Sequence, residues 1–139
     1  MFSLQERVLS KFLKHVSVFQ EFVKSMRHAV RGLILAFQSE RSFRIQTAAA
    51  FVVVILVLVL PFHTWERALL LLATASVLVL ELMNSMIERL IDLVKPRMHS
   101  YVREIKDLMA AAVLVASVFS AVLGFLILLP YLPIVFARI

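Results

Sequence analysis

Acidic and amide side chains recur at helical spacing in a segment that is otherwise largely apolar. At offsets of 0, 3, 4, 7 and 11 they share one face of an α-helix, and they are Glu81, Asn84, Ser85, Glu88 and Asp92. Between them lie six apolar residues and Arg89, so the polar groups form a stripe. A carboxylate inside hydrocarbon costs at least a few kcal/mol unless it is paired, hydrated or protonated. The stripe therefore indicates a functional site.

The acidic residues of this segment differ in their expected depth in the membrane. If the helix enters hydrocarbon near Ala68, Glu81 lies roughly 20 Å in and Glu88 roughly 30 Å in, close to the far interface. Glu81 suits a general base or a proton carrier that meets an alcohol dissolved in the lipid. Glu88 and Glu40, both near that interface, offer the oxygen ligands that Mg²⁺ prefers, and Lys106 can neutralise phosphate charge. This layout fits phosphoryl transfer from a water-soluble donor to a membrane-bound acceptor.

Two other interpretations of the stripe stay open on the residues alone. In a small proton-coupled transporter, Glu81 would be the exchanging acid. Against a transporter stand the small number of spans and the absence of spans broken by Gly or Pro. In a purely structural protein, paired charges would drive oligomerisation, but three acids with one adjacent Arg leave charge unmatched.

The composition restricts the class of protein. The chain has 139 residues, of which 62% are hydrophobic, and its mean hydropathy of +0.94 is too high for a soluble domain of this size. It contains no Cys, which excludes disulfides and thiolate sites. With only two Gly it cannot build a glycine-rich phosphate loop. The basic residues bracket apolar segments and do not form a stripe with aromatics, so we expect no nucleic-acid partner.

Hydropathy and charge predict an all-α membrane protein with three spans. Residues 1–44 are amphipathic and are expected to form an interfacial helix with its basic side toward anionic head groups. Residues 45–139 form the membrane domain. Its expected spans are residues 45–62, 68–94 and 108–129, each long enough to cross the hydrocarbon core.

The distribution of basic residues predicts the orientation. Of the 15 Lys and Arg residues, eight precede residue 45, five lie from Arg89 to Lys106, and only Arg67 and Arg138 remain. This asymmetry places the N-terminus and the connection between the second and third spans in the cytoplasm, facing ATP. Three spans cannot enclose the polar stripe, so we expect a homo-oligomer.

The stripe also resembles a known signature. The run Glu81-Leu-Met-Asn-Ser-Met-Ile-Glu88-x-x-x-Asp92 resembles the E-[LI]-x-N-[ST]-A-I-E-x-x-x-D signature of the prokaryotic diacylglycerol kinase and undecaprenol kinase family. Upstream, residues 39–44 resemble the acidic-x-x-F-R element of that family. Downstream, Ile105-Lys106-Asp107 and residues 110–113 resemble its A-K-D…A-V segment. The resemblance covers roughly residues 25 to 130.

The resemblance implies a homotrimer with an N-terminal surface helix and active sites between subunits. It also implies Mg·ATP-dependent phosphorylation of diacylglycerol or undecaprenol in the bacterial plasma membrane. By position, Glu81 matches the catalytic base, Asn84 the active-site asparagine, and Glu40 and Glu88 the metal-binding acids. The positions that match nucleotide contacts are Glu40, Glu88, His99, Lys106 and Asp107. The positions that match lipid contacts are Phe43, Arg44, Glu81 and Ala110.

Several positions depart from the family pattern. Met86 replaces the usual Ala of the signature, Glu21 stands about where an Arg is expected, and His28 stands about where a Tyr is expected. The first 20 residues exceed the typical family start. Ser85 in the signature favours diacylglycerol as the lipid substrate, whereas residues 39–45 favour a polyprenol. The choice of lipid substrate therefore stays open.

Overall fold

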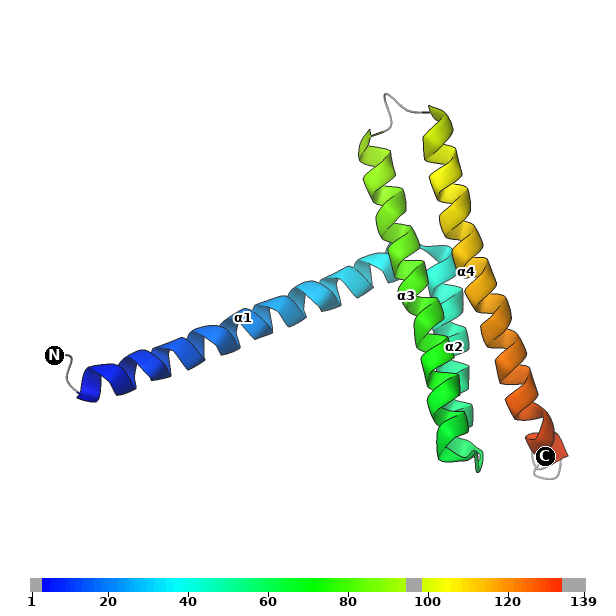
Figure 1. Ribbon diagram of the computed structural model, residues 1–139, viewed down its shortest axis with the longest axis horizontal. Helices are drawn as coiled ribbons and strands as arrows, with labels where there is room; N and C mark the ends of the chain where they lie inside the picture. The colour runs from blue at the N-terminus through cyan, green and yellow to red at the C-terminus, as the bar shows by residue number, and fades with distance from the viewer. Residues whose placement is uncertain (1–3, 95–98, 134–139) are drawn as a thin grey trace. The chain divides into compact units, whose positions relative to one another are not determined.

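All regular secondary structure in the part of the chain that the structure describes is helical. The computed structural model describes the backbone of residues 4–94 and 99–133 and the side chains of residues 19–93 and 101–133. In chain order the elements are α1 (Leu4–Ser39), α2 (Arg41–Val59), α3 (Thr64–Val94), α4 (His99–Leu128) and the 3₁₀-helix η1 (Leu129–Tyr131), shown in Figure 1.

Three helical stretches are long and apolar enough to cross a membrane, which confirms the predicted all-α membrane fold. They are Arg41–Val59, Thr64–Leu93 and Tyr101–Tyr131. The second starts four residues before the expected position 68, and α4 starts nine residues before position 108. Hydropathy marks the part of a helix that lies in hydrocarbon, whereas backbone hydrogen bonding continues into the polar residues at its ends. Part of the polar stretch expected between the second and third spans is therefore helical.

A capping interaction explains why α3 starts at Thr64. Pro61 has no N–H to donate, and Leu60 is extended, so α2 cannot continue. The Glu66 carboxylate accepts a hydrogen bond from the backbone N–H of His63 at 2.7 Å. This contact satisfies one of the N–H groups that a helix leaves unpaired at its start. Trp65, which lies between the expected spans 45–62 and 68–94, is in the first turn of α3 and is exposed.

The chain divides into two compact units after Ser39, and α1 belongs to the first of them. It is a single helix of 36 residues. Its exposed apolar side chains recur at intervals of three or four residues, and in the described part they include Phe19, Phe22, Met26, Val30, Leu33 and Phe37. Lys24, Arg27 and Arg31 lie on its other faces, so α1 is amphipathic.

The second unit is a three-helix bundle in which α3 packs against both α2 and α4 (Figure 1). An apolar cluster lies where the α2–α3 connection meets the C-terminal end of α4. The buried members of the cluster are Val57, Leu60, Phe62, Leu70 and Ile127. Tyr131 packs on this cluster, with its ring edge-on to Phe62 at 4.6 Å. The Tyr131 hydroxyl donates to Glu66 at 2.7 Å, which connects η1, directly after α4, to the start of α3.

Most of the other apolar side chains of the bundle are exposed. Phe51, Leu72 and Phe119 are each about two thirds exposed or more. In a soluble protein such a surface would aggregate, whereas in a bilayer it contacts lipid or other helices. The bundle is therefore built to be covered by hydrocarbon or by neighbouring subunits.

Candidate active site

Glu81 is the most deeply buried member of the polar stripe, with only 2% of the residue exposed. Its carboxylate accepts hydrogen bonds from two side chains of α2. The Ser42 hydroxyl donates to Oε1, and the Gln46 amide donates to Oε2 at 3.2 Å. A carboxylate has about four acceptor sites, so these two donors leave capacity for a further partner. The two α2 side chains fix the orientation of the Glu81 carboxylate.

Sequence reasoning missed both of these donors. From this part of the chain it selected Glu40, Phe43 and Arg44. In the structure Arg44 is exposed and forms no described ion pair with Glu81. Ser42 and Gln46 are four residues apart and so share a face of α2, and that spacing beside an acidic stripe is the signal that could have identified them.

Glu40 lies at the start of α2, close to Arg89 of α3. It is the N-cap residue of α2, and its carbonyl oxygen accepts from the Arg44 backbone N–H at 3.3 Å. Its Oε1 atom lies 3.6 Å from Nη2 of Arg89 on α3. Because Arg89 is largely exposed, this ion pair contributes little to stability. It does place the Glu40 carboxylate beside the end of the stripe that contains Glu88.

Asn84 and Glu88 are four residues apart on α3 and both are half-buried. The Oδ1 atom of Asn84 is buried and has no hydrogen-bond partner among the described residues. Glu88 likewise forms no hydrogen bond or ion pair there. An unpaired buried amide oxygen costs about 1–3 kcal/mol, so a partner absent from the single chain fits at this position.

These oxygen atoms are chemically suited to a divalent cation. Carboxylate and amide oxygens are hard ligands, and Mg²⁺ is usually held by one or two carboxylates together with water and phosphate oxygens. No group of three or more His, Asp or Glu side chains that could hold a metal occurs among the described residues. Glu40, Asn84 and Glu88 carry oxygen atoms of the kind that Mg²⁺ binds together with water and phosphate oxygens.

The last member of the stripe connects α3 to α4. The Nζ atom of Lys106 lies 3.5 Å from Oδ1 of Asp92. This pair brings the amino group of Lys106 to the same end of the bundle as Glu88 and Glu40. Asp107 is exposed next to it. Charged groups of both signs therefore gather at this end, whereas Glu81 lies deeper.

The remaining predicted site residues are placed as follows. Phe43 is buried on α2, whereas Arg44 and Ala110 are exposed. His99 is the first residue of α4, and its side chain lies outside the described residues. Met86, which replaces the small residue of the signature, is about half exposed. The roles assigned to these residues stay predictions.

The chain matches known proteins along most of this region. The family model described as "Prokaryotic diacylglycerol kinase" matches residues 27–128. An undecaprenol kinase of Bacillus subtilis is 35% identical over 118 residues, which cover 85% of this chain and 96% of that protein. A diacylglycerol kinase of Escherichia coli K12 is 31% identical over 75% of this chain and 85% of its own length. A diacylglycerol kinase of Synechocystis is 35% identical over 76% of this chain and 61% of its own length.

The matched segment includes α2, α3 and the whole stripe from Glu81 to Asp92, and it extends to the end of α4. It begins within α1, so the first 26 residues lie outside it. The family suggested by the three sequence elements is thereby confirmed. The chain belongs to the prokaryotic diacylglycerol kinase family.

Proposed function

We propose that the protein is a lipid kinase that transfers the γ-phosphoryl group of ATP to the hydroxyl group of a membrane lipid alcohol. The observation that carries this proposal is the position of Glu81, a carboxylate held inside a membrane span by two α2 donors. Charged groups able to contact a nucleotide lie farther along the same face of α3. The names of the relatives, undecaprenol kinase and diacylglycerol kinase, agree with this acceptor class.

In the proposed reaction Glu81 is the general base. The acceptor hydroxyl donates its proton to a free oxygen lone pair of the Glu81 carboxylate while its oxygen attacks the γ-phosphorus atom. A bond forms between the acceptor oxygen and phosphorus, and the bond from phosphorus to the β–γ bridging oxygen breaks. The products are ADP and a lipid phosphate monoester. Ser42 and Gln46 hold the carboxylate in the orientation that this proton transfer needs.

The nucleotide and its metal are assigned to the outer part of the stripe. Glu40 and Glu88, with the oxygen of Asn84 beside them, would hold Mg²⁺, which when bound neutralises charge on the β- and γ-phosphates. Lys106 would neutralise further phosphate charge. Asp107 and His99, which match nucleotide contacts by position in the family, complete the proposed ATP site. Phe43, Arg44 and Ala110 are proposed to contact the lipid acceptor.

The functional particle is proposed to be a homotrimer with active sites between subunits. Two features support an oligomer: the exposed apolar surface of the bundle and the unpartnered Asn84 oxygen within the stripe. The excess of basic residues before α2 and between Arg89 and Lys106 supports a cytoplasmic site in a bacterial plasma membrane. The amphipathic α1 is proposed to lie at that interface. The relatives are kinases, so proton-coupled transport is not proposed.

Labelled phosphoryl transfer tests this function. Purified protein in mixed micelles would be incubated with Mg²⁺, γ-labelled ATP and either diacylglycerol or undecaprenol. We expect label in at least one lipid, and the two arms identify the preferred acceptor. The Glu104→Gln variant is a matched control, because Glu104 is an exposed carboxylate on α4 outside the stripe. Absence of label in both lipids, with folded protein, would contradict the proposal.

A further inference from the structure

A hydroxyl group of the chain itself contacts the proposed base. The Ser42 hydroxyl donates to Oε1 of Glu81, and the Gln46 amide donates to Oε2 at 3.2 Å. A serine is activated as a nucleophile when its hydroxyl lies within hydrogen-bond reach of a base and a third group orients that base. Ser42, Glu81 and Gln46 form such an arrangement. The Ser42 hydroxyl therefore already contacts the group that would take up its proton.

Ser42 and Glu81 differ in their accessibility. Only 2% of Glu81 is exposed, whereas Ser42 is exposed at the surface of the chain. The proposed site for the metal and the nucleotide includes Glu40, two residues before Ser42 or about 3 Å along the axis of α2. Ser42 thus lies between the shielded base and the end of the bundle to which the phosphate donor is assigned.

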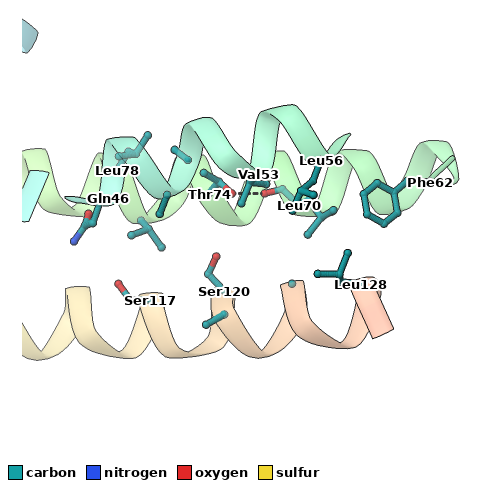
Figure 2. A pocket seen from close by; sticks show the side chains of 15 residues that line it. Gln46, Val53, Leu56, Phe62, Leu70, Thr74, Leu78, Ser117, Ser120 and Leu128 are labelled. Carbon is teal, nitrogen blue, oxygen red and sulfur yellow. Dashed lines mark hydrogen bonds between the residues drawn. The ribbon is translucent and has the colours of Figure 1, made fainter. Parts of the chain in front are cut away.

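Other hydroxyl groups of the bundle have partners that cannot act as a base. Thr47, also on α2, donates to the Phe43 carbonyl oxygen at 2.7 Å. Thr74 lines an apolar groove between α2, α3 and α4, at one end of which lies Gln46 (Figure 2). Its hydroxyl donates to the Leu70 carbonyl oxygen at 2.7 Å. A backbone carbonyl oxygen accepts a hydrogen bond but does not take up a proton as a carboxylate does.

Tyr131 also donates to a carboxylate, but near the other end of α3. Its partner Glu66 precedes Glu81 by 15 residues on α3, or about 22 Å. Arg89 and Lys106, which form ion pairs with acidic residues of the proposed nucleotide region, lie at the opposite end from Glu66. Ser42 therefore combines contact with a base and proximity to the proposed phosphate site.

The start of α2 favours a phosphate group on Ser42. Arg41 is the first residue of α2, and the N-cap residue Glu40 forms no side-chain hydrogen bond that caps the helix. The first N–H groups of a helix have no partner within it and, together with the helix dipole, they stabilise a phosphate. Arg41 and Arg44, both exposed, flank Ser42 in the sequence. A phosphoserine at position 42 would therefore lie where a negative charge is favoured.

We propose that Ser42 is a site of self-phosphorylation, which receives the γ-phosphoryl group of ATP when no lipid alcohol is bound. The Ser42 oxygen attacks the γ-phosphorus atom while Glu81 takes up the hydroxyl proton. The bond from phosphorus to the β–γ bridging oxygen breaks, and the products are ADP and phosphoserine. The inference rests on the proposed kinase function and adds an acceptor within the protein. Because Ser42 and the lipid hydroxyl use the same base, they compete for it.

Labelling of the protein without a lipid acceptor tests this proposal. Full-length protein in a detergent that has no hydroxyl group would be incubated with Mg²⁺ and γ-labelled ATP, and the label would be located by peptide mass spectrometry. We expect phosphoserine at Ser42, and no label from α-labelled ATP. Addition of diacylglycerol or undecaprenol, whichever is the preferred acceptor, should suppress labelling of the protein.

Two variants and a matched control identify the acceptor and the base. Ser42→Ala should lose the label, and Glu81→Gln should slow labelling of Ser42 by about 100-fold or more. Ser39→Ala is the control, because Ser39 is an exposed residue three positions before Ser42 whose hydroxyl donates to the Leu35 carbonyl oxygen at 2.8 Å. It should be labelled as wild type is. Oligomer mass and ATP binding show that each variant is assembled.

Several results would overturn the proposal. They are label that persists in Ser42→Ala, a wild-type rate of labelling in Glu81→Gln, and label released by hydroxylamine, which marks a carboxyl phosphate and not a phosphoserine. Wild-type protein that phosphorylates a lipid alcohol but carries no label at Ser42 would overturn this inference alone. Label at Ser42 without any labelled lipid would contradict the proposed lipid acceptor and would leave Ser42 as the acceptor.

Discussion

Glu81 shows how a carboxylate is accommodated inside a membrane span. Burial of an unpaired charge there would be costly, but two hydrogen bonds from α2 reach its oxygens. Both donors are neutral, so they orient the carboxylate without pairing its charge. An ion pair with Arg or Lys would have neutralised it. The charged partners of the site lie instead at its outer end, where Arg89 faces Glu40 and Lys106 faces Asp92.

The Ser42→Ala variant tests the orienting role of the α2 donors. Loss of one of two hydrogen bonds leaves the Glu81 carboxylate less restrained, so we expect kcat to fall by about tenfold, the equivalent of roughly 1.4 kcal/mol in the barrier. The KM for ATP should change little. Ser76→Ala serves as the control, because the Ser76 hydroxyl bonds only to the Leu72 carbonyl oxygen of its own helix. Equal kcat for wild type and Ser42→Ala would contradict the assigned role.

The Glu88→Gln variant tests the proposed metal site. Replacing a carboxylate ligand by a neutral amide weakens the attraction for Mg²⁺. We therefore expect the Mg²⁺ concentration for half-maximal activity to rise by about tenfold or more, and activity to disappear when EDTA removes the metal. The measurement is a Mg²⁺ titration at saturating ATP, with Glu104→Gln as the control. An unchanged titration curve would exclude Glu88 as a metal ligand.

The helical period placed the stripe correctly on one face of a membrane helix, and the three sequence elements identified the family. The partners of the stripe could not be read from the sequence in the same way. Whether Ser42 or Arg44 faces Glu81 depends on the rotation of α2 about its axis and on its register against α3, and both depend on packing. The hydroxyl of Ser42 reaches Glu81, whereas Arg44 is exposed.

At the scale of elements, α3 organises the bundle, and its two ends are fixed by different means. At the Thr64 end, Glu66 caps the helix and accepts the Tyr131 hydroxyl, so one carboxylate joins α3 to the end of α4. At the other end the ion pair between Lys106 and Asp92 connects the two helices. The starts of α3 and α4 were not predictable from hydropathy, because capping and polar helical turns extend beyond the apolar spans.

The Tyr131→Phe variant tests the connection between α3 and α4. The ring remains against Phe62, but Glu66 loses a hydrogen bond, so we expect lower stability. The readout is the thermal unfolding midpoint in detergent. Tyr101→Phe should have no such effect, because Tyr101 is largely exposed. A midpoint equal to that of wild type would show that the hydrogen bond does not stabilise the bundle.

At the scale of the whole molecule, a single chain leaves polar and apolar groups of its described part without partners. The Asn84 oxygen has no partner among the described residues, and most apolar side chains of the bundle are exposed. Composition and hydropathy predicted the membrane class and the number of spans. They do not determine how copies associate, because association depends on the detailed shape of the exposed faces.

Mixed oligomers test whether active sites form between subunits. Glu81→Gln and Lys106→Ala subunits are each expected to be inactive or nearly so. If one subunit supplies Glu81 and its neighbour supplies Lys106, subunits mixed before assembly should recover a substantial fraction of wild-type activity. Co-purification with two different tags shows that mixed particles form. Mixed particles that stay as inactive as the separate variants would indicate that each site lies within one subunit.

The most direct test of the central claim is phosphoryl transfer by the Glu81→Gln variant. The rate of label transfer from γ-labelled ATP to the preferred lipid alcohol would be compared with wild type at saturating substrates, alongside ATP binding and oligomer mass. We expect the rate to fall by about 100-fold or more, with ATP affinity and assembly unchanged. A rate within about twofold of wild type in a correctly assembled variant would show that the buried carboxylate is not the base.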